Sequence, residues 1–515
     1  MSIKSLPARP DLGQLKKQAK ELLDAVRADE AAARKRIAQA GGNDAAEKFA
    51  LSDAQRVIAR EHGFPSWAKL KLHVETRTAD PAEERLIEAA LEGDAATVRT
   101  LRAERPALAT RSVYAAAALG EADAVRAELA RTKGGPRDWE PLLYVCFGRV
   151  GAGDGERAAI AKQLLANGAD ANAAWIHQDW PEARLSALYG ATGVNNYPRL
   201  ARVQLTAGAN PNDGESRYHA AEHNHTACLE VLAEFGADFS GADKTWGNTP
   251  LYFLFGYMHA SAAVKSGVRW LLEHGANPNA ISHAGTTAET ALHAAVNHDW
   301  DVDTIGLLLR HGADPAAKRA DGRTALALAV RGGRGEIAGI LRAHGAPGGV
   351  SIPDEFLGAC MRADAAAARA LLRKEPGLTG VLTAEDRKLV LTAAREGRAA
   401  AVSLMGELGF DLEVEGEDGE RALHWAAWHG WAETVRSLVA RRVELNRCDR
   451  RYGAPPSGWC AHGSQFCGNP AGEHGKALES LIAAGAFVPP DTGGSAEVMV
   501  VLKKHGLGRA RTRRK

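Results

Sequence analysis

Cysteine is scarce in this sequence, with six residues among 515 and no CxxC pair. Domains stabilised by disulfides are rich in cysteine, whereas sparse, scattered cysteine is typical of proteins in reducing compartments. Long apolar runs are also missing. No stretch of about 18 apolar residues occurs, and the first 20 residues contain no signal-peptide core. We therefore expect a soluble, cytoplasmic protein without a membrane span.

An excess of charge of one sign is missing as well. Lys and Arg number 64 and Asp and Glu 63, so the formal net charge is +1. Proteins that bind nucleic acid along their whole length carry a clear basic excess, so this balance argues against such binding. Two local exceptions exist. Residues 1–78 carry 15 Lys and Arg against 10 Asp and Glu, and residues 509–515 read RARTRRK. We interpret both as solvated termini, because no aromatic or glycine pattern accompanies the charge.

Catalytic signatures are missing too. The sequence contains no HExxH and no GxSxG, and GAGDGE at 151–156 lacks the last glycine of a dinucleotide-binding loop. One group of metal-ligand types lies within 27 positions but lacks the short spacings of structural zinc sites. We expect no catalytic residue, no cofactor and no metal, and an inert, buried thiol at Cys460. The members of this group are Cys448, Cys460, His462, Cys467 and His474.

Repeats are what the sequence does contain. A Gly-Ala pair, usually followed by Asp or Asn, recurs along the chain as in LLANGAD, LLEHGAN and LLRHGAD. Six of the seven glycines have Leu four residues earlier, one helical turn away, which is the arrangement of a glycine that ends a helix. The pattern predicts a helix that stops at each of Gly168, Gly208, Gly236, Gly275, Gly312, Gly345 and Gly485.

A second phrase precedes several of these glycines. It reads GNTPLYFLF at 247–255, ETALHAAV at 289–296, GRTALALAV at 322–330 and GERALHWAAW at 419–428. A Thr ahead of Pro or Ala and Leu is a helix start, since its hydroxyl satisfies free N–H groups and Pro is tolerated in the first turn. Each unit therefore reads as helix, turn, helix, glycine stop and extended loop.

The two phrases together resemble the ankyrin repeat, whose motif runs Thr-Pro-Leu-His-x-Ala-Ala and later Leu-Leu-x-x-Gly-Ala-Asp. The resemblance covers residues 213–346 and 415–447 most clearly, and residues 83–109, 113–131 and 355–378 keep the two-helix pattern in degenerate form. It implies an all-α solenoid of about a dozen imperfect units. Residues 148–157, 174–185 and 466–475 lengthen single units and are expected to project as loops.

The N-terminal residues follow a different pattern. Leu12, Leu15, Ala19, Leu22, Leu23 and Val26 fall on one helical face. Ser52 with Gln55 suggests a capping box, Gly63 a helix end and Ser66 another helix start. This segment looks like a helical module found ahead of ankyrin repeats in many bacterial proteins. We expect four regions: the module at 1–78, repeats at 81–346 and 353–488 that meet at GAPGGVSIP, and a C-terminal helix with its basic tail at 489–515.

Candidate contact residues follow from the repeat register. His424 occupies the histidine of the motif, which braces neighbouring repeats, and Trp425 a packed position. The positions just before the turn glycine face the concave surface in this architecture, where exposed aromatic side chains suit peptide recognition. Tyr252 alternatively replaces the bracing histidine. The expected partner-binding residues are Trp428, His429, Trp431 and His462, followed by Trp246, Tyr252 and Trp300.

The resemblance implies a non-enzymatic scaffold that binds another protein through its concave groove and loop tips. We expect a monomer. Two alternatives stay open. The module at 1–78 could act as a nucleic-acid or regulatory adaptor, or the Cys and His residues at 448–474 could serve an enzyme or a metal-binding protein.

Overall fold

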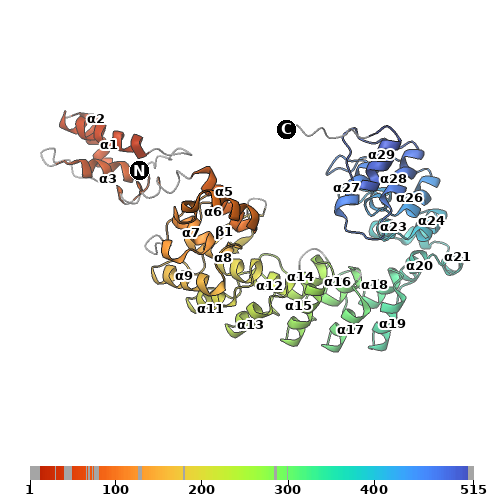
Figure 1. Cartoon of the computed structure of the whole chain (residues 1–515). Helices are drawn as coiled ribbons and strands as arrows, with labels where there is room; N and C mark the ends of the chain where they lie inside the picture. The colour runs from red at the N-terminus through yellow and green to blue at the C-terminus, as the bar shows by residue number, and fades with distance from the viewer. Residues whose placement is uncertain are drawn as a thin grey trace. The chain divides into compact units, whose positions relative to one another are not determined.

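The computed structural model divides the chain into two compact units, residues 1–285 (unit 1) and residues 286–515 (unit 2). It describes residues 12–28, 30–39, 49–64, 66–67, 70–71, 74, 80–125, 130–177, 180–283, 287–298 and 300–507. The basic segment 509–515 and most of the helix expected after Ser66 lie outside the described residues. Figure 1 labels the elements of both units.

Unit 1 begins with three helices that form a core of their own. They are α1 (Leu12–Arg27), α2 (Ala31–Gln39) and α3 (Leu51–Glu61). The expected face of α1 is confirmed, because five of its six residues are buried and only Leu12 is half-buried. The expected capping box is wrong. The helix begins one residue earlier than Ser52, and Asp53 instead accepts a hydrogen bond from the backbone N–H of Ala50 at 3.0 Å.

The rest of unit 1 consists of short helices, mostly in pairs, with 3-10 turns and one π-helical turn between them. The 3-10 and π turns are η2 (Pro106–Thr110), η3 (Ala122–Ala124) and η5 (Gly190–Val194). The helices are α5 (Pro81–Glu92), α6 (Ala95–Glu104), α7 (Val113–Leu119), α8 (Pro141–Phe147), α9 (Asp154–Ala166), α10 (Ala187–Tyr189), α11 (Pro198–Thr206), α12 (Ser216–Glu222), α13 (Thr226–Glu234), α14 (Pro250–Tyr257) and α15 (Ala262–Glu273).

Unit 2 continues in helix pairs. Its elements are α16 (Ala291–Asn297), α17 (Val302–Arg310), α18 (Ala325–Arg331), α19 (Gly335–Ala343), α20 (Ile352–Met361), α21 (Ala365–Lys374), η6 (Leu378–Val381), α22 (Ala384–Arg387), α23 (Leu389–Arg395), α24 (Ala399–Glu407), α25 (Ala422–Trp428), α26 (Ala432–Ala440), α27 (Pro456–Phe466), α28 (His474–Ala483) and α29 (Ala496–Lys504).

The pairs stack in two layers. In unit 2 the first helix of a pair contacts the first helix of the next, as α16 with α18 and α25 with α27, and the second helices do the same, as α17 with α19 and α26 with α28 (Figure 1). Each repeat thus buries its apolar faces against its neighbours, which is the packing of a helical solenoid. The expected all-α repeat fold is confirmed.

The local signals that define each pair act as the sequence predicts. All seven repeat glycines have left-handed backbone conformations, with φ of 80° to 93°, so each provides the stop that a residue with a Cβ would strain. Two of the predicted helix starts are also confirmed. The hydroxyl of Thr249 accepts a hydrogen bond from Tyr252 N at 3.1 Å, and that of Thr324 accepts one from Ala327 N at 3.3 Å.

One of the expected loops contains the short sheet of unit 1. Strands β1 (Ala174–Ile176) and β2 (Arg184–Ser186) pair antiparallel, with Trp175 opposite Leu185. Trp175 and Ile176 are residue types that favour strands, although the repeat motif has a loop here.

The glycine-rich insertion at 148–153 is held against the solenoid by an arginine. The side chain of Arg157 is 0% exposed, and its guanidinium donates to the carbonyls of Val145 at 2.8 Å, Val150 at 2.9 Å and Ala118 at 3.0 Å. A Cβ at Gly151 would lie 2.1 Å from a backbone oxygen of α7. The first glycine of GAGDGE, Gly151, therefore permits close backbone packing.

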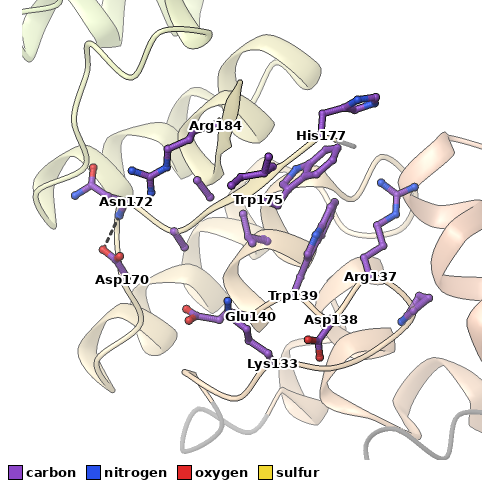
Figure 2. Close-up of a pocket in the computed structure, with 15 residues that line it drawn as sticks. Lys133, Arg137, Asp138, Trp139, Glu140, Asp170, Asn172, Trp175, His177 and Arg184 are labelled. Atoms are coloured by element: carbon purple, nitrogen blue, oxygen red, sulfur yellow. Dashed lines mark hydrogen bonds between the residues drawn. The ribbon is translucent and has the colours of Figure 1, made fainter. Parts of the chain in front are cut away.

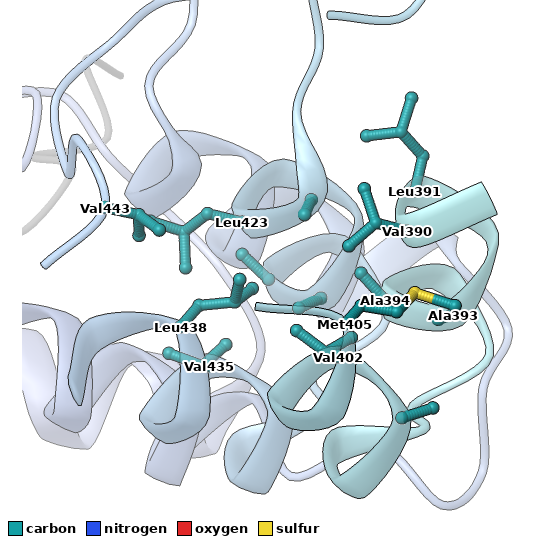
Figure 3. Packing of buried hydrophobic residues seen from close by; sticks show 14 of the residues in the cluster. Val390, Leu391, Ala393, Ala394, Val402, Met405, Leu423, Val435, Leu438 and Val443 are labelled. Carbon is teal, nitrogen blue, oxygen red and sulfur yellow. The ribbon is translucent and has the colours of Figure 1, made fainter. Parts of the chain in front are cut away.

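Unit 2 has a continuous apolar core between the two layers. Figure 3 shows Val402 and Met405 of α24 beside Val435 and Leu438 of α26, below residues of α23 and α25. These residues are close to fully buried. Within this unit, α18 contacts α20 across the predicted break at 345–353, and the predicted domain boundaries stay predictions.

Candidate functional site

The first helices of the pairs in unit 2, called inner helices below, border an aromatic cleft of about 510 Å³. Its lining comes from α25, α27 and the loop between α26 and α27. The lining residues carry indole, phenol and imidazole rings or very small side chains, and none carries a carboxylate. They are Trp425, Trp428, Tyr452, Ala454, Gly458, Trp459 and His462.

Trp459 is the centre of this aromatic cleft. Its ring centroid lies 5.4 Å from that of Trp425 and 5.8 Å from that of Trp428, both with edge-to-face geometry. Tyr452 approaches the same ring at 6.4 Å, and His462 lies 5.5 Å from Trp428. Edge-to-face pairs are the favoured arrangement of aromatic rings, so these side chains support one another.

A buried carboxylate fixes the loop that carries Tyr452. Asp449 is 3% exposed, and its carboxylate accepts hydrogen bonds from Trp459 Nε1 at 2.9 Å, Tyr452 N at 2.6 Å and Ala454 N at 3.0 Å. These bonds hold the pKa of Asp449 below its usual value although burial opposes the shift. The ionised Asp449 is therefore fully engaged in positioning the loop and the central indole.

His424 supports the cleft from behind. Its ring is 1% exposed, lies 5.3 Å from the Trp459 ring, and accepts a hydrogen bond at Nδ1 from Arg421 N at 3.1 Å. Burial lowers the pKa of His424 to about 4, so the ring is neutral at pH 7. Trp425, which the motif places in the core, packs against the core and also lines the cleft.

The helix that carries Trp459 approaches the helix of Trp428 unusually closely. A Cβ at Gly463 would lie 2.0 Å from the carbonyl oxygen of Trp428. That oxygen also accepts a hydrogen bond from His474 Nε2 at 3.0 Å. The glycine thus sets the spacing between α25 and α27, on which the cleft depends.

The structure brings two of the expected contact residues into the cleft, Trp428 and His462. His429 is half-buried and stacks on Trp425 with ring centroids 6.3 Å apart. Trp431 has a bracing position, because its Nε1 donates to Arg395 O at 2.8 Å and its indole covers Gly397. These two residues lie beside the cleft and outside its lining.

The second set of expected residues is not gathered at one site. Trp246 is 37% exposed and donates from Nε1 to Glu215 at 2.8 Å. Tyr252 and Trp300 are only 5% and 1% exposed. The expectation that these two rings present a contact surface does not agree with their burial, since Tyr252 on α14 and Trp300 in the turn before α17 are both taken up by packing within the repeats. We do not propose a contact role for them.

Sequence reasoning missed Tyr452 and Trp459. A signal for Trp459 was present, because Cys460 matches the small buried alanine of the motif, so Trp459 corresponds to Trp425 in the preceding repeat. Tyr452 had no such signal, since it lies in a loop whose path depends on Asp449.

The metal-ligand types at 448–474 do not form one cluster. Cys467 Sγ lies 3.5 Å from His474 Nε2, while Cys448 and His462 are exposed. Cys460 is buried and its thiol lies 3.4 Å from His474 O, which agrees with the expected inert thiol. Across the part of the chain that the structure describes, no three His, Cys, Asp or Glu side chains come together to hold a metal ion.

Unit 1 contains a larger cavity, of about 850 Å³, between the loop at 133–140 and the β1–β2 hairpin (Figure 2). Trp139 and Trp175 lie against each other with centroids 5.1 Å apart, and the Arg137 guanidinium lies 5.0 Å from the Trp139 ring centroid. Charged side chains of both signs surround these rings, including Glu140 and Arg184. The lining therefore defines no single ligand chemistry.

No helix among the described residues is long and apolar enough to cross a membrane.

Comparisons with known proteins identify the repeats. A model of three consecutive ankyrin repeats matches residues 257–350, and a model of a single ankyrin repeat matches residues 418–450. Human ankyrin repeat and SOCS box protein 6 is 27% identical over 206 residues, which cover 36% of this chain and 48% of that protein. Mouse ankyrin repeat and SOCS box protein 11 is 34% identical over 113 residues, or 22% of this chain and 32% of that protein.

A third similar protein is a putative E3 ubiquitin-protein ligase, XBAT34, of Arabidopsis thaliana, 32% identical over 130 residues that cover 25% of this chain and 33% of that protein. The chain thus spans about half the length, or less, of these three curated relatives, which come from human, mouse and Arabidopsis thaliana. The crystal structure of the human ASB11 ankyrin repeat domain is also similar. The match covers 46% of this chain and 99% of the ASB11 chain, with 25% identity and a TM-score of 0.34. With its matched segments and its two layers of paired helices, the chain contains ankyrin repeats and has an all-α solenoid fold.

Proposed function

We propose that the protein is a non-enzymatic scaffold that binds another protein through the aromatic cleft of unit 2. The observation that carries the proposal is the gathering of three indoles, one phenol and one imidazole around a cavity of about 510 Å³. Aromatic side chains contribute large contact area with little conformational entropy to lose, which makes them frequent centres of protein interfaces. Ankyrin repeats imply protein partners, and the concave face is where solenoids present extended binding surfaces.

Exposure of the rim supports this proposal. Tyr452 is 68% and Phe466 is 64% exposed, and His462 links Phe466 to the cleft with ring centroids 4.5 Å apart. An apolar surface thus continues from the loop at 452 across Trp428 to the end of α27. Exposed apolar surface of this kind on a protein is typical of an interaction site.

The test is affinity capture from an extract of the cells that express the protein, followed by mass spectrometry. The bait is the full chain beside a Trp428→Ala, His462→Ala double variant and a Trp246→Ala control, whose exposed indole lies in unit 1. We expect a protein that the wild type and the control retain and the double variant loses, with unchanged circular dichroism. Equal retention by a folded double variant would remove the cleft as the binding site.

A further inference from the structure

Two exposed arginines border the aromatic cleft, and one of them, Arg451 beside Tyr452, is paired with Asp418. The Arg395 guanidinium carbon lies 6.0 Å from the centroid of the Trp425 ring, near the outer limit of a cation–π contact. Arg395 ends α23, the inner helix that precedes α25 and contacts it. Its side chain is exposed, so it offers a positive charge at the edge of a cleft whose lining contains no Lys, Arg, Asp or Glu.

The same guanidinium also lines a neighbouring groove of about 840 Å³. The other arginines of that groove are engaged with carboxylates. Arg334 pairs with Glu396 at 3.3 Å, Arg319 with Glu289 at 3.2 Å, and Arg331 with the buried Asp386. Among the residues that the structure describes, no carboxylate forms an ion pair with Arg395.

The two carboxylates that lie beside the loop of the cleft are already occupied. Asp449, the one buried carboxylate behind the lining, accepts three hydrogen bonds from its own loop and from Trp459. Asp418, beside the loop, pairs with Arg451 at 3.2 Å. A basic ligand would therefore find no free carboxylate in the lining. It would also meet Arg395 at the edge of the cleft, where the two positive charges repel each other.

The charge of Arg395 affects the pKa of the neighbouring imidazole of His429. Burial, and after it the positive charge of Arg395, lowers the pKa of His429 to about 4, so this ring is neutral at pH 7. The surroundings of the cleft thus combine aromatic rings with a positive charge, that of Arg395, that forms no ion pair with a carboxylate among the described residues.

We infer that the cleft takes a segment of a partner protein that presents a large apolar or aromatic side chain to the rings and a carboxylate to Arg395. The inference rests on the proposed function and adds the chemistry of the segment. The apolar side chain contributes the area that is buried, and the carboxylate satisfies the guanidinium and sets the orientation of the segment. A guanidinium and a carboxylate can pair through two parallel hydrogen bonds, which makes the recognition directional.

The experiment is selection from a random 12-residue peptide library displayed on phage, with the full chain immobilised. Four baits are compared: wild type, Arg395→Glu, Trp428→Ala, and Arg373→Glu as a control with the same change in charge at an exposed residue of α21. We expect peptides selected by the wild type to combine Phe, Trp or Leu with Asp or Glu within four residues. The control should select the same peptides, and Trp428→Ala should select none of them.

Charge reversal at Arg395 is the decisive arm. A representative selected peptide should bind Arg395→Glu roughly five- to tenfold more weakly than the wild type, as expected for an exposed pair whose sign is reversed. Selection on that variant should shift toward Lys and Arg.

The outcomes separate the two claims. Peptides that depend on Trp428 but show no acidic enrichment, or that bind Arg395→Glu as well as wild type, would overturn the inference and leave the proposed function standing. The absence of any selected peptide that depends on Trp428 would overturn both.

Discussion

At the scale of single residues, the aromatic cleft depends on positions where a larger side chain does not fit. Gly463 is the clearest, since its missing side chain lets α27 approach the carbonyl of Trp428. Gly339 in α19 is its natural counterpart. It also lies inside a helix of unit 2, but an added Cβ there would meet nothing within 4 Å.

These two glycines should therefore respond to alanine in opposite directions. Gly463→Ala forces two inner helices apart and is expected to lower the free energy of unfolding by about 1–3 kcal/mol. Gly339→Ala should raise it by about 0.5–1 kcal/mol, because alanine restricts the unfolded chain and favours helix. Urea titrations followed by circular dichroism measure both. Destabilisation of similar size in the two variants would refute the packing argument.

A second prediction at this scale concerns acid. His424 is neutral in the folded protein because burial lowers its pKa to about 4 from 6.5. Between these two pH values the unfolded chain binds a proton at His424 that the folded chain does not. The contribution of neutral His424 to the free energy of unfolding is therefore complete above pH 6.5 and is lost as the pH falls toward 4. We expect the loss to be on the order of 2 kcal/mol.

The measurement is the free energy of unfolding at pH 7 and at pH 4.5 for wild type, His424→Gln and the exposed-residue control His462→Gln. The first variant should lose less stability on acidification than the wild type, and the control should match the wild type. Since His429 also has a lowered pKa, the first variant should still keep part of the pH dependence. An identical slope in all three proteins would count against a neutral, buried His424.

At the scale of elements, the loop from 449 to 454 determines whether the rings form a cleft. Asp449→Ala removes the acceptor for two backbone N–H groups and the Trp459 indole. We expect destabilisation of about 1–3 kcal/mol, the cost of leaving buried donors unpaired, together with weaker binding of any partner captured by the wild type.

Asp411→Ala is the matched control, because this exposed loop aspartate accepts a hydrogen bond from the backbone N–H of Glu413 two residues on. It should change stability and capture little. Near-ultraviolet circular dichroism reports the packing of the tryptophans, and a spectrum of Asp449→Ala identical to that of the wild type would show that the loop does not position Trp459.

The elements also show which features of the fold and of the cleft could be predicted from the sequence. Helix ends at the seven repeat glycines and starts at Thr249 and Thr324 could be predicted, because each depends on a few adjacent residues. The shared position of Trp428 and His462 in the lining of the cleft could be predicted from their register, and their contact role stays a prediction. The path of the 449–454 loop could not, because it depends on hydrogen bonds to a carboxylate and an indole brought together by folding. The burial of Trp300 likewise depends on packing that a repeat motif does not specify, whereas the burial of Tyr252 agrees with the position of the bracing histidine.

At the scale of the whole molecule, a solenoid distributes its stability among contacts between neighbouring units. Helix α27 contacts α25 and α28. A local defect in one repeat should therefore remain local.

Gly463→Ala should accordingly raise hydrogen–deuterium exchange in α25, α27 and α28 and leave exchange in unit 1 unchanged. The wild type and Gly339→Ala serve as references. A uniform rise in exchange throughout residues 1–285 would show a cooperativity that contacts between neighbouring repeats do not explain.

The central claim is that the aromatic cleft of unit 2 contacts a protein partner directly. The most direct test places a photoreactive benzoylphenylalanine at position 462, which is exposed and lines the cleft, and in a second protein at position 381, where Val381 is 66% exposed outside the lining. After irradiation in cell extract, we expect a covalent adduct with one protein from position 462 and none from position 381. The same adduct from both positions, or from 381 alone, would contradict the account.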